Sequence, residues 1–171
     1  MNINMKKKLI VTSLLAASVF ASAANAAAIN ITGTISSSPC AATVDTIKMP
    51  NINLNSLGTK VGVTNDASAK DITIKLTGCP AMQQTAKVTF TGTADKVNKK
   101  ALELTGVEGV ALALFEKDGT TAIDIGATAA DQTLTGSQTK DLEYKVKYVT
   151  TATTFKPGDA KGVLNYTIAY N

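Results

Sequence analysis

The sequence has 171 residues, with 17 basic and 13 acidic side chains, and it contains no histidine, no tryptophan and no arginine. Without histidine it lacks the commonest general base and metal ligand, and without arginine it lacks the side chain that most often binds phosphate or guanine through two hydrogen bonds. The composition therefore argues against an enzyme and against a nucleic-acid-binding protein, and we expect no cofactor.

Residues 1–26 have the pattern of a secretory signal peptide. Three consecutive lysines precede an apolar stretch from Leu9 to Ala21, which ends in small residues. Because this stretch is shorter than the ~20 residues of a membrane span, an N-terminal anchor is the weaker interpretation. We expect cleavage after Ala26, with Ala23 and Ala28 as alternatives. Cleavage after Ala26 leaves 171 − 26 = 145 residues, in which we expect no membrane span.

The two cysteines, Cys40 and Cys79, both lie in the part of the chain that would be exported. Exported proteins meet an oxidising compartment, so we expect these residues to be bonded to each other. A free catalytic cysteine is the alternative, but the chain has no histidine to serve as its base.

Beyond residue 26, apolar and polar residues alternate and β-branched residues are frequent, which predicts an all-β protein. Strands are expected at 27–35, 71–79, 87–91, 110–115, 142–148 and 164–170, with shorter runs at 47–49, 52–54 and 123–125 and loops at 65–69, 91–95 and 126–136. In the second strand we expect Ile72, Ile74 and Leu76 to point inward, and in 110–115 we expect both faces to be covered. This pattern is typical of a single immunoglobulin-like sandwich.

Strongly alternating strands stand at both ends of the mature chain. Residues 27–35 place isoleucines on one face and Asn30, Thr32 and Thr34 on the other, and residues 164–170 alternate in the same way. Such strands are exposed edges unless they are paired. Two interpretations are open from the residues alone: the strands pair within one subunit, or they join the sheets of two neighbouring subunits.

Four features follow one another in order along the mature chain. They are residues 29–35 followed by Pro39 and Cys40, the cysteine pair, the segment 87–95, and an alternating last strand with a penultimate Tyr170 and with Gly158 at the fourteenth place from the end. This ordered set resembles the type 1-like fimbrial subunits of the chaperone–usher family. The resemblance covers nearly all of the mature chain.

The resemblance implies an incomplete immunoglobulin-like β-sandwich that lacks its seventh strand, so that a groove exposes core side chains. In that family a periplasmic chaperone first inserts a strand of its own, and the N-terminal segment of another subunit replaces it at the outer-membrane usher. For this chain the resemblance implies a donor segment at 27–35 and a pilin domain at 36–171. Ala27, Ile29 and Ile31 would enter a neighbour's groove, and Gly33 would allow close backbone approach. The strand that faces the chaperone and the groove would comprise Gly158, Leu164, Tyr166, Ile168 and Tyr170.

The resemblance thus implies a structural subunit of an adhesive pilus at the cell surface, with neighbouring pilins as partners. Its donor segment is short, as in minor tip-adaptor pilins, so the place of the subunit in the shaft or near the tip is open. The alternative is a single-domain adhesin at the fibre tip that binds carbohydrate or a host surface. Such sites usually present aromatic residues in loops, whereas here all four tyrosines lie in the last two expected strands and Phe155 is the one aromatic expected in a loop.

Carboxylates offer the remaining route to a catalytic or metal site. Glu103 with Glu108, or Asp118 with Asp124, are the candidate pairs, but solvation at the surface is the commoner fate of such residues. Asp118 and Gly119 form a dipeptide that is typical of hairpin turns, and the segment around them lacks the carboxylate spacing of a calcium loop. We therefore expect neither catalysis nor metal binding.

Overall fold

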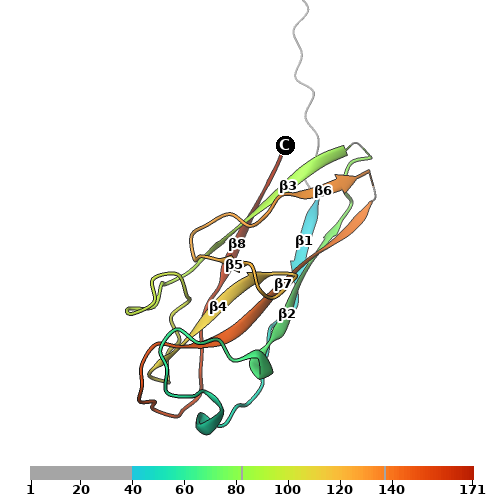
Figure 1. Cartoon of the computed structure of the whole chain (residues 1–171). Coiled ribbons are helices and arrows are strands. Elements are labelled where there is room, and N and C mark those ends of the chain that lie inside the picture. The colour runs from blue at the N-terminus through green and yellow to red at the C-terminus, as the bar shows by residue number, and fades with distance from the viewer. Residues whose placement is uncertain (1–39, 82, 137) are drawn as a thin grey trace, which may run out of the picture. The chain divides into compact units, whose positions relative to one another are not determined.

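The computed structural model describes residues 40–81, 83–136 and 138–171, whose strands form two antiparallel sheets (Figure 1). All of these residues belong to one compact unit, Ser36–Asn171. The expected signal peptide at 1–26 and the expected donor segment at 27–35 lie outside the described residues.

The larger sheet has five strands in the order β1-β2-β7-β4-β5, and the smaller has three in the order β6-β3-β8. The larger sheet consists of β1 (Ala41–Val44), β2 (Lys70–Thr77), β4 (Val110–Glu116), β5 (Ala122–Ile123) and β7 (Thr139–Thr150). The smaller sheet consists of β3 (Gln83–Thr91), β6 (Gln132–Thr135) and β8 (Asn165–Tyr170). Two short 3-10 helices, η1 (Leu54–Ser56) and η2 (Asp66–Ser68), lie in the connection from β1 to β2.

Alternation along the strands builds the core between the two sheets. In β2, Ile72, Ile74 and Leu76 are buried, as predicted from the sequence. Phe90 of β3 meets Tyr144 of β7 edge to face, with ring centroids 4.9 Å apart. Because these rings come from different sheets, the contact joins the two layers. The prediction of an all-β sandwich is confirmed.

The outer face of the larger sheet is polar and ion-paired. Lys145 of β7 pairs with Asp71 of β2. The buried Lys147 binds Asp66 of η2 at 2.7 Å and donates to the carbonyl oxygen of Gly119, also at 2.7 Å. These bonds tie two loops onto the sheet, so this face offers little apolar surface to a partner.

The structure corrects the predicted strands in three places. A strand, β6, forms inside the stretch expected to be a loop at 126–136, because its single buried residue, Leu134, gives too weak an alternation to read. The runs at 47–49 and 52–54 are not strands, and Pro50 between them has no N–H to donate to a sheet. In β4, Leu112 and Ala113 are only half-buried, so the expected cover on both faces is incomplete.

The disulfide joins Cys40, just before β1, to Cys79, just after β2, as the sequence predicts. Both residues are buried, and their Cα atoms are 4.4 Å apart. The bond closes a loop of 39 residues. In the chain-entropy model, closing such a loop lowers the conformational entropy of the unfolded chain, which stabilises the folded state by about 4 kcal/mol.

We expect the double variant Cys40→Ser and Cys79→Ser to melt at a lower temperature, by roughly 10 °C or more for a domain of this size. Circular dichroism of the exported chain under oxidising conditions measures this. Thr77→Ser, an exposed change on β2, is the matched control. Equal melting temperatures for the double variant and the control would contradict the assigned role of the disulfide.

Candidate functional site

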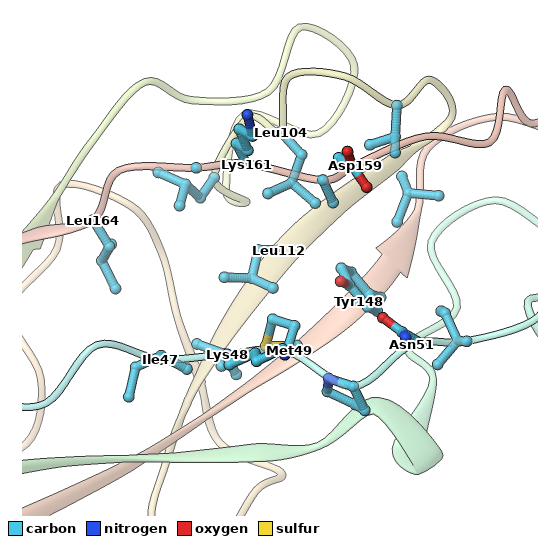
Figure 2. A pocket seen from close by; sticks show the side chains of 18 of the residues that line it. Ile47, Lys48, Met49, Asn51, Leu104, Leu112, Tyr148, Asp159, Lys161 and Leu164 are labelled. Carbon is cyan, nitrogen blue, oxygen red and sulfur yellow. The ribbon is translucent and has the colours of Figure 1, made fainter.

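A cavity of about 1080 Å³ opens between residues 44–52 on one side and residues 156–166 on the other. Figure 2 shows Ile47, Met49 and Asn51 along the first side and Leu164, Lys161 and Asp159 along the second. Inward-facing side chains of β3, β4 and β7 line it from below, among them Phe90, Leu112 and Tyr148. We call this cavity the groove and its two sides the walls.

The first wall is an extended segment without a sheet partner. Among the described residues, no backbone hydrogen bond joins residues 45–52 to any other part of the chain. Ile47 and Met49 are half-buried and pack against the main core, while Lys48 and Asn51 between and beside them are exposed. The wall therefore combines strand-like alternation with backbone groups that are free to accept a strand.

The second wall begins with β8, the edge strand of the smaller sheet. Among the described strands, β8 pairs with β3 alone, with Ile168 opposite Val88 and Tyr166 opposite Phe90. Its inward-facing side chains are half-buried, while Thr167 and the other outward residues are exposed. An edge strand whose core-facing residues remain half-exposed is suited to receive a further strand.

The end of β8 lies next to the start of β1. The hydroxyl of Tyr170 donates a long hydrogen bond of 3.5 Å to the carbonyl oxygen of Cys40, the first residue of the disulfide. Burial, and then the nearby Tyr166, raise the pKa of the Tyr170 hydroxyl. The hydroxyl therefore stays protonated at physiological pH and remains a donor.

The part of the second wall that precedes β8 is residues 156–161, which pair with residues 105–108 in a short ribbon. The N–H of Lys161 donates to the Thr105 carbonyl at 3.0 Å, and the N–H of Thr105 donates back at 2.8 Å. Lys156 and Glu108 exchange two similar bonds of 3.2 Å, and their side chains form an ion pair at 2.9 Å. We call residues 105–108 and 156–161 the ribbon. Residues 105–108 pair with this half of the wall, as β3 pairs with the half that belongs to β8.

The chemistry of the groove is that of an apolar binding surface. The charged residues that line it are all exposed: Asp45, Lys48, Lys156, Asp159 and Lys161. Burial raises the pKa of Tyr148 in its floor, so this phenol stays neutral at physiological pH. In the described part of the chain, no three metal-ligating side chains gather, and no helix is long and apolar enough to cross a membrane. The groove therefore combines an apolar floor, which includes Phe90, Leu112 and Tyr148, with exposed charged side chains.

Some of the site residues predicted from the sequence line the groove and some do not. Gly158, Leu164 and Tyr166 line it, whereas Ile168 and Tyr170 lie farther along β8 and pack against the core. Ala27, Ile29, Ile31 and Gly33 lie outside the described residues. Sequence reasoning missed the first wall and residues 105–108. The apolar residues Ile47 and Met49, two positions apart, were the one signal that pointed to the first wall.

Known proteins share both the sequence pattern and the fold. A family model for fimbrial proteins matches residues 29–171. The F17 fimbrial protein of Escherichia coli is 31% identical over 184 residues, and the alignment covers 96% of this chain and 98% of that protein.

Two solved structures resemble the described sandwich. The P pilus rod subunit PapA aligns with a TM-score of 0.64 at 20% identity, covering 78% of this chain and all of that chain (100%). A Burkholderia pseudomallei antigen and type I fimbria protein aligns with a TM-score of 0.58 at 24% identity, covering 77% of this chain and 94% of that one. These matches confirm the immunoglobulin-like arrangement of the pilins. The chain belongs to the fimbrial protein family, so it is a structural protein of a surface fimbrium that assembles with other pilin subunits, and it is not an enzyme.

Proposed function

We propose that this chain is a structural subunit of an adhesive pilus and that its subunits are joined by donor-strand exchange. In this scheme residues 27–35 of one copy insert into the groove of a neighbouring copy and extend the sheet that ends at β8. The observation that carries the proposal is the pair of walls in the described part of the chain: residues 45–52, which make no backbone hydrogen bond to the rest of the chain, and the segment that runs into β8, whose outer edge has no strand partner and whose Tyr166 lines the groove. A strand between them would give hydrogen-bond partners to both edges.

Residues 27–35 have the length and the pattern of a strand that could enter this groove. Nine extended residues span roughly 30 Å, a typical strand length or somewhat more. Their alternation would turn Ala27, Ile29 and Ile31 toward the core, where Phe90 and Leu112 form part of the floor. Each isoleucine that becomes fully buried would contribute about 1.5–3 kcal/mol. Gly33 would let the donor backbone approach the walls without a side chain.

An unfilled groove needs a partner during export. Its half-buried apolar side chains and free backbone edges would otherwise promote aggregation. We propose that a periplasmic chaperone fills the groove first, by placing a strand against Leu164, Tyr166, Ile168 and Tyr170, and that exchange for the donor segment takes place at an outer-membrane usher. The signal peptide proposed at 1–26 would bring the chain to that compartment.

A chain with the proposed donor segment as well as a groove would have its place inside the fibre. A subunit at the very tip needs a groove but has no subunit to complete, so a donor segment would be superfluous there. The four tyrosines also lie in β7 and β8, where they pack in or beside the core. They form no aromatic platform of the kind that a carbohydrate-binding site uses. These observations support an internal subunit over the tip adhesin.

We expect Ile29→Asp combined with Ile31→Asp to stop the subunit from acting as a donor, because two carboxylates would have to enter an apolar groove. The subunit should still fold and be captured by the chaperone through its own groove. Electron microscopy of fibres and gel analysis of unheated polymers measure assembly. Asn30→Asp with Thr32→Asp adds the same charge to the opposite face and should assemble. Normal fibres from the isoleucine variant would refute donor-strand exchange by residues 27–35.

A second prediction concerns the acceptor side. We expect Ile168→Asp with Tyr170→Asp to abolish chaperone capture, because both side chains turn toward the core. The subunit should then be degraded or aggregate, as measured by the amount that co-purifies with the chaperone. Thr167→Asp with Ala169→Asp, on the exposed face of the same strand, should leave capture intact. Accumulation of the first variant as a soluble monomer would show that β8 is not a groove wall.

A further inference from the structure

We infer that Gly106 and Gly158 are positioning residues for the groove, acting as a contacting pair that holds the ribbon half of the second wall in line. This inference rests on the proposed function, since it concerns the wall that the donor strand would join. Nothing in the sequence singles out Gly106. For Gly158 the resemblance implied a place in the surface that faces the chaperone, whereas the geometry gives it a role inside the wall itself.

The two glycines meet backbone to backbone. A Cβ atom added at Gly158 would overlap the carbonyl oxygen of Gly106, and a Cβ atom added at Gly106 would overlap the carbonyl oxygen of Asp159. Gly106 also has a φ of +83°, which side chains disfavour. No shift of a flexible side chain could relieve these overlaps, because the atoms in the way are backbone atoms. The close approach of residues 105–108 to residues 156–161 therefore requires glycine on both sides.

The position of the ribbon matters because it lines the groove with both of its segments. Val107 comes from the first segment, and residues 156–161 form the wall itself. An added methyl group at either glycine would force the segments apart and move the Lys156–Lys161 backbone out of line with β8. An inserted strand bonds to its acceptor along a continuous edge, so a step in that edge would interrupt the ladder. The glycines act on the donor strand through the wall, without needing to touch the strand.

The chain offers a closely matched control for the backbone strain. Gly62 has the same φ of +83°, but no atom lies within 4 Å of a Cβ added there, and Gly62 does not line the groove. Gly62→Ala therefore carries the conformational strain of Gly106→Ala without the collision. The difference between these two variants isolates the contact between the two segments.

The experiment measures binding of a fluorescent synthetic peptide, with the sequence of residues 27–35, to the chain purified after export. We expect Gly106→Ala and Gly158→Ala to weaken peptide binding by about tenfold or more, as overpacking against rigid atoms does, and Gly62→Ala to leave it within about twofold. Amide hydrogen exchange supplies a readout that general destabilisation would not give. The Lys161 N–H, which donates to Thr105, should exchange faster in the two variants, while the amides between β3 and β8 keep their protection.

A second route tests the ribbon if the glycine variants do not accumulate. Thr105→Pro removes the N–H that donates to the Lys161 carbonyl at 2.8 Å. We expect it to weaken peptide binding in the same direction while the pairing of β3 with β8 persists.

The outcomes separate the two proposals. If the unaltered chain does not bind the peptide, the proposed function is wrong. If the unaltered chain binds it and Gly106→Ala binds as well as Gly62→Ala, the role of the glycine pair is wrong and the proposed function stands. Weaker binding with unchanged exchange at Lys161 would also overturn the role assigned to the ribbon.

Discussion

The need of every buried backbone N–H and C=O for a hydrogen-bond partner is the constraint on which this structure depends. Among the described strands, β2 lies between β1 and β7, and β7 lies between β2 and β4, so both have strand partners on each side. Residues 45–52 and the free edge of β8 do not, and both border the same groove. β1, β5 and β6 are edge strands as well, but the groove lies between the unpaired segment 45–52 and residues 156–166, which run into β8. In the proposed assembly a strand would complete these edges better than a small ligand could, because a strand carries a row of backbone donors and acceptors.

The parts of the fold that repeat a simple pattern could be predicted from the sequence. Period-two alternation identified the inward face of β2, because one face of that strand is wholly buried. It also identified the half-buried face of β8, and the cysteine count together with the expected compartment identified the disulfide. The alternation is a local property of each strand, and the disulfide follows from the number of cysteines.

The rest depends on contacts between distant parts of the chain. The first wall alternates apolar and polar residues, so Ile47 and Met49 were predicted to lie in a short strand. In the described structure this segment pairs with no strand. Nothing near Gly106 in the sequence shows that it lies against Gly158, because the two are 52 residues apart, 158 − 106 = 52, and their contact is made by backbone alone. A family resemblance marked Gly158, but it supplied no physical reason for a glycine there. The pairing of the ribbon supplies that reason.

The direction of β8 has a consequence for how a fibre would bear load. In the proposed assembly the donor segment lies alongside β8, so tension between subunits acts along the strands and not across them. All the backbone hydrogen bonds of the joint would then be stretched together, in shear, and none could open ahead of the others as they do when a strand is peeled from one end. The disulfide, which ties the start of β1 to β2 close to Tyr170, would fasten the wall at the point where that pull enters the domain. The groove would thus work as a mechanical joint as well as a binding site.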